Sequence, residues 1–128
     1  MRMTREQWDE LVDHARADAP NECCGLVWGR DGSVEQVERA ENKRNSPYGF
    51  ELTFAGLTKA NDLDDESFEV GVYHSHPRSA PEPSQTDINM AQYPHWTWLI
   101  VSLEHEEAEI RAWRIADGRV SEEPIEVS

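Results

Sequence analysis

The sequence predicts an α/β fold in which helices pack on a mixed β-sheet. One segment near the N-terminus has its apolar residues at helical spacing, whereas three later runs are short, apolar and typical of strands. Helical and strand segments alternate along the chain, and this alternation favours a sheet with helices on its faces. The three strand-like runs span residues 25–28, 69–75 and 97–103.

The first helix is predicted over residues 4–18. Thr4 is a preferred N-cap residue, and Pro20 prevents the helix from continuing. Apolar residues recur on one face of this helix, where they can pack on a sheet. They are Trp8, Leu11, Val12 and Ala15.

A hairpin is predicted after this helix. Residues 25–28 form its first strand, and the glycine-containing segment 29–33 forms the turn. The returning strand contains Val34 and Val37.

The middle of the chain is predicted to alternate between strands and helices. In chain order the elements are a strand at 50–54, a helix at 55–63, a strand at 69–75, a rigid loop with three prolines at 77–83, and a short helix at 84–92. Ser84 is the expected N-cap of the last helix.

The C-terminal part is predicted to be mainly β. Residues 97–103 form a strand, and residues 109–115 and 119–127 form a hairpin. Asp117-Gly118 between them is the strongest turn signal in the sequence.

Length and charge limit the protein class. The 128 residues match one domain, expected to span residues 1–128. The formal net charge of −14 disfavours nucleic-acid and membrane partners, because phosphate backbones and anionic lipids are repelled. The apolar runs are too short for a membrane span, and the N-terminus lacks a signal-peptide pattern, so a cytoplasmic location is expected. The acidic, lysine-poor composition is typical of a halophile or a high-GC genome.

The candidate metal-binding residues lie in and after the segment around His74 and His76. Residues two apart on a strand point to the same face, so both imidazoles can reach one metal ion. Asp87 begins the next helix and can provide a third ligand. Three protein ligands leave one coordination position open, as in catalytic zinc sites.

A metal site of this kind needs a general base. Glu22 is the candidate, because its segment precedes the strand at 25–28 and can pack beside the metal strand. Ser84 can donate a hydrogen bond to a developing oxyanion. Each residue also has a structural interpretation: the histidines as half-exposed surface residues, Ser84 with Asp87 as a helix-capping pattern, and Glu22 as a surface carboxylate. The combination of these residues in one sequence favours a catalytic metal site over the separate structural interpretations.

The combination resembles the JAMM motif of the MPN+ zinc metallopeptidases. That motif has an upstream Glu, then His-Ser/Thr-His-Pro, then a Ser and an Asp at the spacing found here. The context Pro20-Asn21-Glu22-Cys23-Cys24-Gly25-Leu26 is similar to the family's glutamate segment, and the resemblance extends to the strand at 99–102.

The resemblance implies a cytidine-deaminase-like α/β fold and one zinc ion per chain. His74, His76 and Asp87 would be the zinc ligands, Glu22 the base and Ser84 the oxyanion donor. Ser75, between the ligands, would point away from the metal and have no catalytic role.

The short chain resembles the compact prokaryotic branch of the family. That branch cleaves after the C-terminal Gly-Gly of small β-grasp, ubiquitin-like sulfur-carrier proteins, in one group with release of cysteine. A tail without side chains fits a narrow groove and can add as a strand. Residues 48–66 are expected to flank this groove, with Tyr48 and Phe50 as contacts or, alternatively, as core residues.

Three alternatives remain open. The enzyme can instead be an isopeptidase that removes a ubiquitin-like modifier from lysine. It can be a non-catalytic zinc-binding scaffold, although a scaffold does not need Glu22. It can be a cysteine hydrolase using Cys23 or Cys24, although a reactive thiol needs an electropositive setting and Glu22 is adjacent. The sequence does not indicate the oligomeric state.

Overall fold

The computed structural model describes all 128 residues and contains one curled, mixed sheet of eight strands in the order β7-β6-β5-β4-β2-β3-β1-β8. The strands are β1 (Arg2–Met3), β2 (Cys24–Arg30), β3 (Ser33–Ala40), β4 (Glu69–His76), β5 (Thr97–Ser102), β6 (Glu109–Ala116), β7 (Arg119–Glu123) and β8 (Glu126–Val127). β4 runs parallel to β5 and antiparallel to β2. The predicted mixed α/β fold is confirmed.

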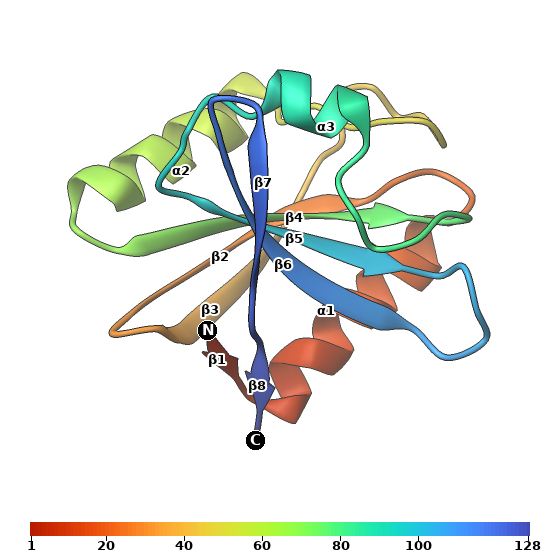
Figure 1. Ribbon diagram of the computed structural model, residues 1–128, viewed down its shortest axis with the longest axis horizontal. Coiled ribbons are helices and arrows are strands. Elements are labelled where there is room, and N and C mark those ends of the chain that lie inside the picture. The colour runs from red at the N-terminus through yellow and green to blue at the C-terminus, as the bar shows by residue number, and fades with distance from the viewer.

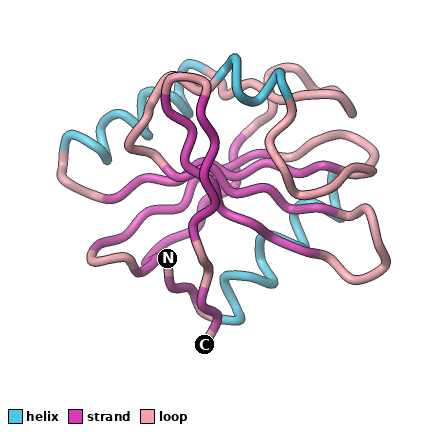
Figure 2. Tube along the Cα trace, viewed as in Figure 1, coloured by secondary structure: helices cyan, strands magenta, loops and turns pink.

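Helices cover both faces of this sheet. They are α1 (Arg5–Asp18), α2 (Phe54–Asp65) and α3 (Gln85–Met90). In Figure 1, α1 lies below the sheet, whereas α2 and α3 lie above it, and Figure 2 shows the strands fanning out between these helices. Each face therefore has its own apolar core, one under α1 and one under α2. No helix is both long and apolar enough to cross a membrane.

α1 confirms the first predicted helix. Thr4 is the N-cap, and it forms a reciprocal capping box with Gln7. Leu11 and Ala15 are completely buried against the sheet. This packing anchors the chain immediately before the segment that contains Glu22.

β4 is the strand that carries the histidine pair, and it is buried along almost its whole length. Its side chains alternate between the two cores, with Tyr73 in the α1 core and Val72 in the α2 core. Gly25 lies opposite Tyr73 on β2, where an added Cβ would clash with the Tyr73 ring. The alternation places His74 and His76 on the face that α2 and α3 cover.

Two predicted elements of the middle segment are corrected. Residues 50–54 are not a strand, because Thr53 caps α2 and Phe54 already belongs to that helix. The segment before it makes only the isolated bridges Asn42↔Leu52 and Ser46↔Gly49. The helix predicted at 84–92 is shorter, since α3 ends at Met90 and Ala91 has an extended ψ of 107°.

The predicted strand at 119–127 is also corrected, because it divides at Pro124 into β7 and β8. Proline has no amide hydrogen for the ladder, so the chain leaves β6 there. β8 then pairs in parallel with β1, a two-residue strand that the sequence analysis missed. The two outermost strands of the sheet are thus separated in sequence only by residues 124–125.

Candidate metal centre

The two histidines of the predicted motif converge at the end of β4. Their side chains are almost fully buried, with 1% of His74 and 4% of His76 exposed. The two Nε2 atoms lie 3.2 Å apart. Phe50 stacks on the His74 ring at 4.4 Å between centroids, so it shields one side of the pair from solvent.

Asp87 completes the group from the first turn of α3. Its Oδ2 atom lies 3.1 Å from the Nε2 of His74 and 3.1 Å from the Nε2 of His76. The Ser84 amide donates to the same oxygen at 2.9 Å, and the Asp87 amide donates to the Ser84 hydroxyl at 3.1 Å. This capping box orients the carboxylate towards the histidines.

The three atoms fit a zinc ion. They form a nearly equilateral triangle with sides of 3.1, 3.1 and 3.2 Å. A tetrahedral ion at about 2.05 Å from each ligand would separate the ligand atoms by roughly 3.3 Å. Two imidazoles and one carboxylate are also a usual donor set for catalytic zinc.

The tautomer of His76 and the burial of His74 suit metal binding. The Nδ1 of His76 lies 2.9 Å from the carbonyl of Ala80, and donation there leaves the Nε2 lone pair available. Burial lowers the pKa of His74, which favours the neutral form. Burial also disfavours charged His76, but the hydrogen bonds to Asp87 and Ala80, together with the negative charges of Asp87 and Glu22, outweigh it and raise the pKa of His76. Burial opposes ionisation of Asp87, yet the two histidines hold its pKa well below its usual range.

Glu22 lies in the link between α1 and β2, and only 7% of the residue is exposed. Its Oε1 atom is buried without a hydrogen-bond partner. Burial raises the pKa of Glu22 to about 7, although the charge of His76 acts in the opposite direction. A carboxyl with a pKa near neutrality can both accept and release a proton, as a general base requires.

Ser84 serves as the N-cap of α3, so the structural interpretation of the Ser-x-x-Asp pattern is confirmed. Its oxygen accepts from the Asp87 amide, which leaves the hydroxyl hydrogen free to donate elsewhere. Ser84 also lines a surface hollow, the polar hollow, with Glu22 and His76. Its capping role is therefore compatible with a role in catalysis.

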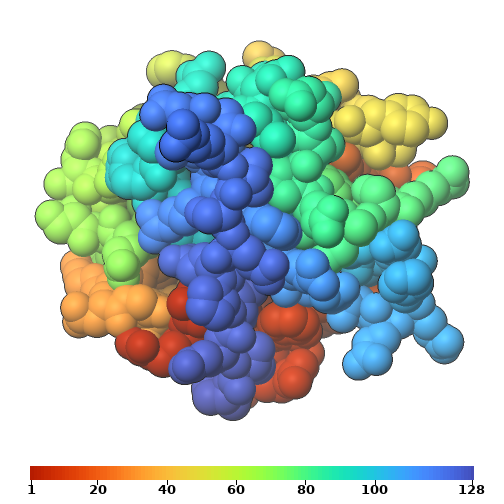
Figure 3. Space-filling model, viewed as in Figure 1, coloured from red at the N-terminus to blue at the C-terminus, as the bar shows by residue number.

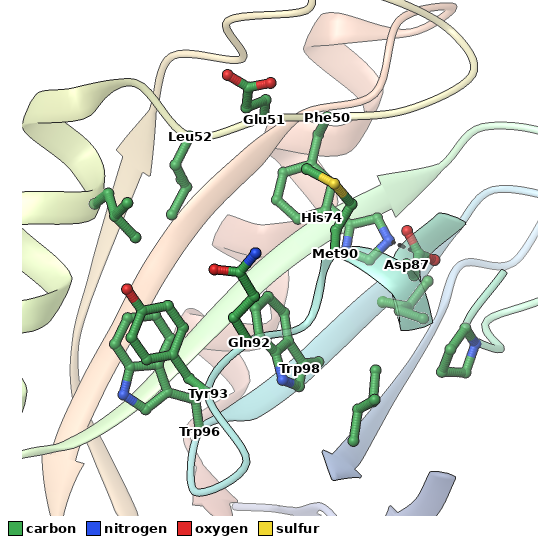
Figure 4. Close-up of a pocket in the computed structure, with 14 residues that line it drawn as sticks. Phe50, Glu51, Leu52, His74, Asp87, Met90, Gln92, Tyr93, Trp96 and Trp98 are labelled. Atoms are coloured by element: carbon green, nitrogen blue, oxygen red, sulfur yellow. Dashed lines mark ion pairs between the residues drawn. The ribbon is translucent and has the colours of Figure 1, made fainter. Parts of the chain in front are cut away.

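A second, apolar hollow also reaches the metal centre, at His74 and Asp87. Figure 4 shows the Phe50 ring and the Met90 side chain beside His74, with Trp98 farther along the wall. Tyr48 lies instead on the rim of the polar hollow, and 82% of it is exposed. In the space-filling view, the yellow atoms of the segment around residues 42–50 project beside the green atoms that lead into α3 (Figure 3).

The remaining sequence candidates lie off the centre. Ser75 points towards the α1 face, where its hydroxyl accepts from the Cys23 amide at 2.8 Å. Burial raises the pKa of Cys23 to about 11 and that of Cys24 to about 12, so both thiols stay protonated near neutrality. This disfavours the cysteine-hydrolase alternative.

Asn42 is a residue near the centre that the sequence does not predict. Its side-chain amide donates to the carbonyls of Glu22 and Gly49, two residues far apart in the sequence. Nothing in the local pattern indicates these contacts, because they depend on tertiary structure.

Comparison with known proteins identifies the family. Residues 4–116 match the family described as prokaryotic homologs of the JAB domain, and the chain belongs to that family. It is a JAMM-type hydrolase of the compact prokaryotic branch. It is 37% identical over 123 residues to the CysO-cysteine peptidase of Mycobacterium tuberculosis, covering 91% of this chain and 84% of the relative.

Two further proteins are similar over most of this chain. The desampylase of Pyrococcus furiosus is 36% identical over 110 residues, covering 83% of this chain and 76% of the relative. A protein of Desulfitobacterium hafniense, solved in solution, matches with a TM-score of 0.85 and 34% identity, covering 99% of this chain and 92% of that one.

The burial of Glu22 predicts a pH-dependent stability difference. In the metal-free protein its pKa is about 7 rather than 4.5, so the folded state retains a proton that the unfolded state loses between these values. Stability therefore falls as pH rises through this window, by about 2–3 kcal/mol. Glu22→Gln removes this dependence and should be more stable than the parent at pH 8 but similar at pH 4.5. Denaturant unfolding in chelator measures both proteins; parallel pH profiles would contradict the prediction.

Proposed function

We propose that this protein is a zinc-dependent peptidase that hydrolyses the bond after the C-terminal Gly-Gly of a ubiquitin-like sulfur-carrier protein and releases cysteine. The observation that carries the proposal is the ligand triangle of His74, His76 and Asp87 beside the buried carboxyl of Glu22. The similarity to a CysO-cysteine peptidase supports the choice of substrate. We place the reaction in the cytoplasm.

The roles follow from the positions of the side chains. His74, His76 and Asp87 would hold one zinc ion, which when bound acidifies water and polarises the scissile carbonyl. Glu22 accepts the proton of the attacking water and passes it to the leaving amine. The Ser84 hydroxyl donates to the carbonyl oxygen as negative charge develops there.

The two hollows suggest where each part of the substrate lies. The polar hollow contains Glu22, which must reach the leaving amine, so the released cysteine belongs on that side. The apolar hollow then receives the carrier's tail, between Phe50 and Met90. Glycines suit this position, because the tail must pass closely beside buried side chains.

Removal of the Phe50 ring is expected to weaken binding of the tail. Phe50→Ala should raise KM for the carrier conjugate by about 5- to 20-fold, since burial of an aromatic side chain stabilises a contact by roughly 1–2 kcal/mol. Tyr48→Ala should have a smaller effect, because Tyr48 lies on the polar rim. Steady-state kinetics with a purified conjugate measure both. An unchanged KM in Phe50→Ala would exclude the tail contact, and unchanged cleavage by Tyr48→Ala would count against a contact there.

A deconjugating isopeptidase is the second candidate, and the similarity to a desampylase favours it. The chemistry at the metal is the same, and only the leaving group differs. A non-catalytic zinc-binding scaffold is disfavoured, because a buried carboxyl is costly to keep unless it has a role.

One experiment separates these functions. The purified protein is assayed for zinc per chain and incubated with a carrier ending in Gly-Gly-Cys and, separately, with a carrier linked to a lysine side chain, each with and without chelator. Chelator-sensitive release of cysteine, faster than release from lysine, is expected. Faster release from lysine would support the isopeptidase, bound zinc without cleavage would support the scaffold, and a protein that binds no zinc would exclude all three.

A further inference from the structure

The side chain of Asn42 links the backbone of Glu22 to the segment that shields the metal ligands. Its Nδ2 donates to the Glu22 carbonyl at 2.9 Å and to the Gly49 carbonyl at 3.2 Å. Its Oδ1 accepts from the amides of Arg44 at 3.0 Å and Glu51 at 3.1 Å. Two donated and two accepted bonds use the full hydrogen-bonding capacity of the amide.

The backbone of Glu22 itself makes only one other hydrogen bond, although the adjacent Cys23 is bonded to Ser75 of β4 through its amide and its carbonyl. β2 begins only at Cys24, so Glu22 precedes the sheet ladder. Its amide donates to the Ser46 carbonyl at 2.9 Å, and its carbonyl accepts from Asn42. Both bonds reach the segment between β3 and α2, so this segment positions the base together with the Cys23–Ser75 bonds to β4.

The same segment carries the wall of the metal centre. Glu51, whose amide Asn42 holds, directly follows Phe50, the residue that stacks on His74. Figure 4 shows the Phe50 ring over His74 and the Glu51 side chain turned away from the hollow. The Asn42 side chain thus restrains the backbone of Glu22 and, through Glu51, the segment that places Phe50 on His74.

We infer that Asn42 is a positioning residue, which holds Glu22 in place for proton transfer at the metal centre. The inference rests on the proposed function. Asn42 makes no hydrogen bond to β4 or α3, the elements that supply the three metal ligands. Replacement of Asn42 should therefore slow proton transfer by Glu22 without loss of the metal ion.

Two variants test this role. Asn42→Ala removes all four hydrogen bonds, whereas Asn42→Asp retains the two acceptors and loses both donors, including the one to Glu22. In both variants kcat should fall by about 10- to 100-fold, the usual loss when a supporting hydrogen bond at a metal site is removed. KM should change by less than about twofold, and zinc per chain should equal that of the parent.

Gln7→Ala is the matched control. Gln7 is also a half-buried amide whose side chain bonds to backbone, donating to the Val34 carbonyl at 3.0 Å and accepting from Thr4 at 2.9 Å, but it lies at the start of α1. It should lower the melting temperature while leaving kcat unchanged. If Asn42→Ala folds poorly, Asn42→Asp still tests the role, because aspartate preserves the volume of the side chain.

The outcomes are distinct. A normal kcat in a folded, zinc-loaded Asn42→Asp protein would overturn the inference alone, and so would loss of zinc from that variant. A parent protein that binds zinc but cleaves no Gly-Gly conjugate would instead overturn the proposed function.

Discussion

Glu22→Gln is expected to lower kcat/KM for the carrier conjugate by about 10³-fold while one zinc ion per chain remains bound. Removal of a general base typically costs 10²- to 10⁴-fold in rate. Glutamine has nearly the shape of protonated glutamate, so the packing around the site should not change. Metal retention is expected because none of the three ligand atoms belongs to Glu22.

The measurement combines zinc content with the initial rate of cysteine release. Glu107→Gln, which removes an exposed carboxylate, controls for the change in net charge and should behave like the parent. A Glu22→Gln protein with at least half the parent's activity would show that another group moves the proton.

Asp87→Ala is expected to abolish activity by releasing the metal. Loss of a group that only supports a ligand costs 10- to 100-fold in affinity, so loss of a ligand should cost more than about 100-fold. Zinc at about 1,000 times its Kd stabilises a folded protein by about 4 kcal/mol, which raises the melting temperature by roughly 10 °C or more. The parent should show this shift with added zinc, and the Asp87→Ala variant should show almost none.

Asp64→Ala is a suitable control. Asp64 also bonds to a histidine, with its Oδ2 2.7 Å from the Nε2 of His95, but this pair lies on the surface apart from the metal centre. It should keep the zinc-dependent rise in melting temperature. A full zinc response in Asp87→Ala would exclude this carboxylate as a ligand.

The parts predictable from sequence are those whose causes are local. The helix at 4–18 follows from the N-cap Thr4, from apolar residues that recur on one helical face, and from Pro20, which ends the helix. All three features lie within one segment. The turn at Asp117-Gly118 has φ of 53° and 74° at these residues, the left-handed region that such pairs favour. His74, His76 and Asp87 were identifiable for the same reason, because one strand, one loop and one helix turn connect them.

The parts that the sequence did not predict depend on distant contacts. Phe50 has a strand-like side chain, but Thr53 starts a helix and the backbone of Glu51 bonds to Asn42 instead of joining the sheet. β1 and β8 are too short to show the alternation of buried and exposed residues that is typical of strands. They form because they pair with each other. The burial of Glu22 and the role of Asn42 likewise arise only once the segment between β3 and α2 folds over the end of β4.

The pairing of β1 with β8 also affects how the protein can be joined to others. The Ser128 amide donates to the Met3 carbonyl at 3.1 Å, and the Arg5 amide donates to the Ser128 carbonyl at 3.0 Å, so the two ends are held together. Figure 1 shows both ends at the lower edge of the view, where β1 and β8 form one edge of the sheet, whereas α3 lies at the top. A protein tethered to either end would therefore leave the approach to the metal centre open, and a carrier attached there through a long flexible linker would be presented to the site at high local concentration.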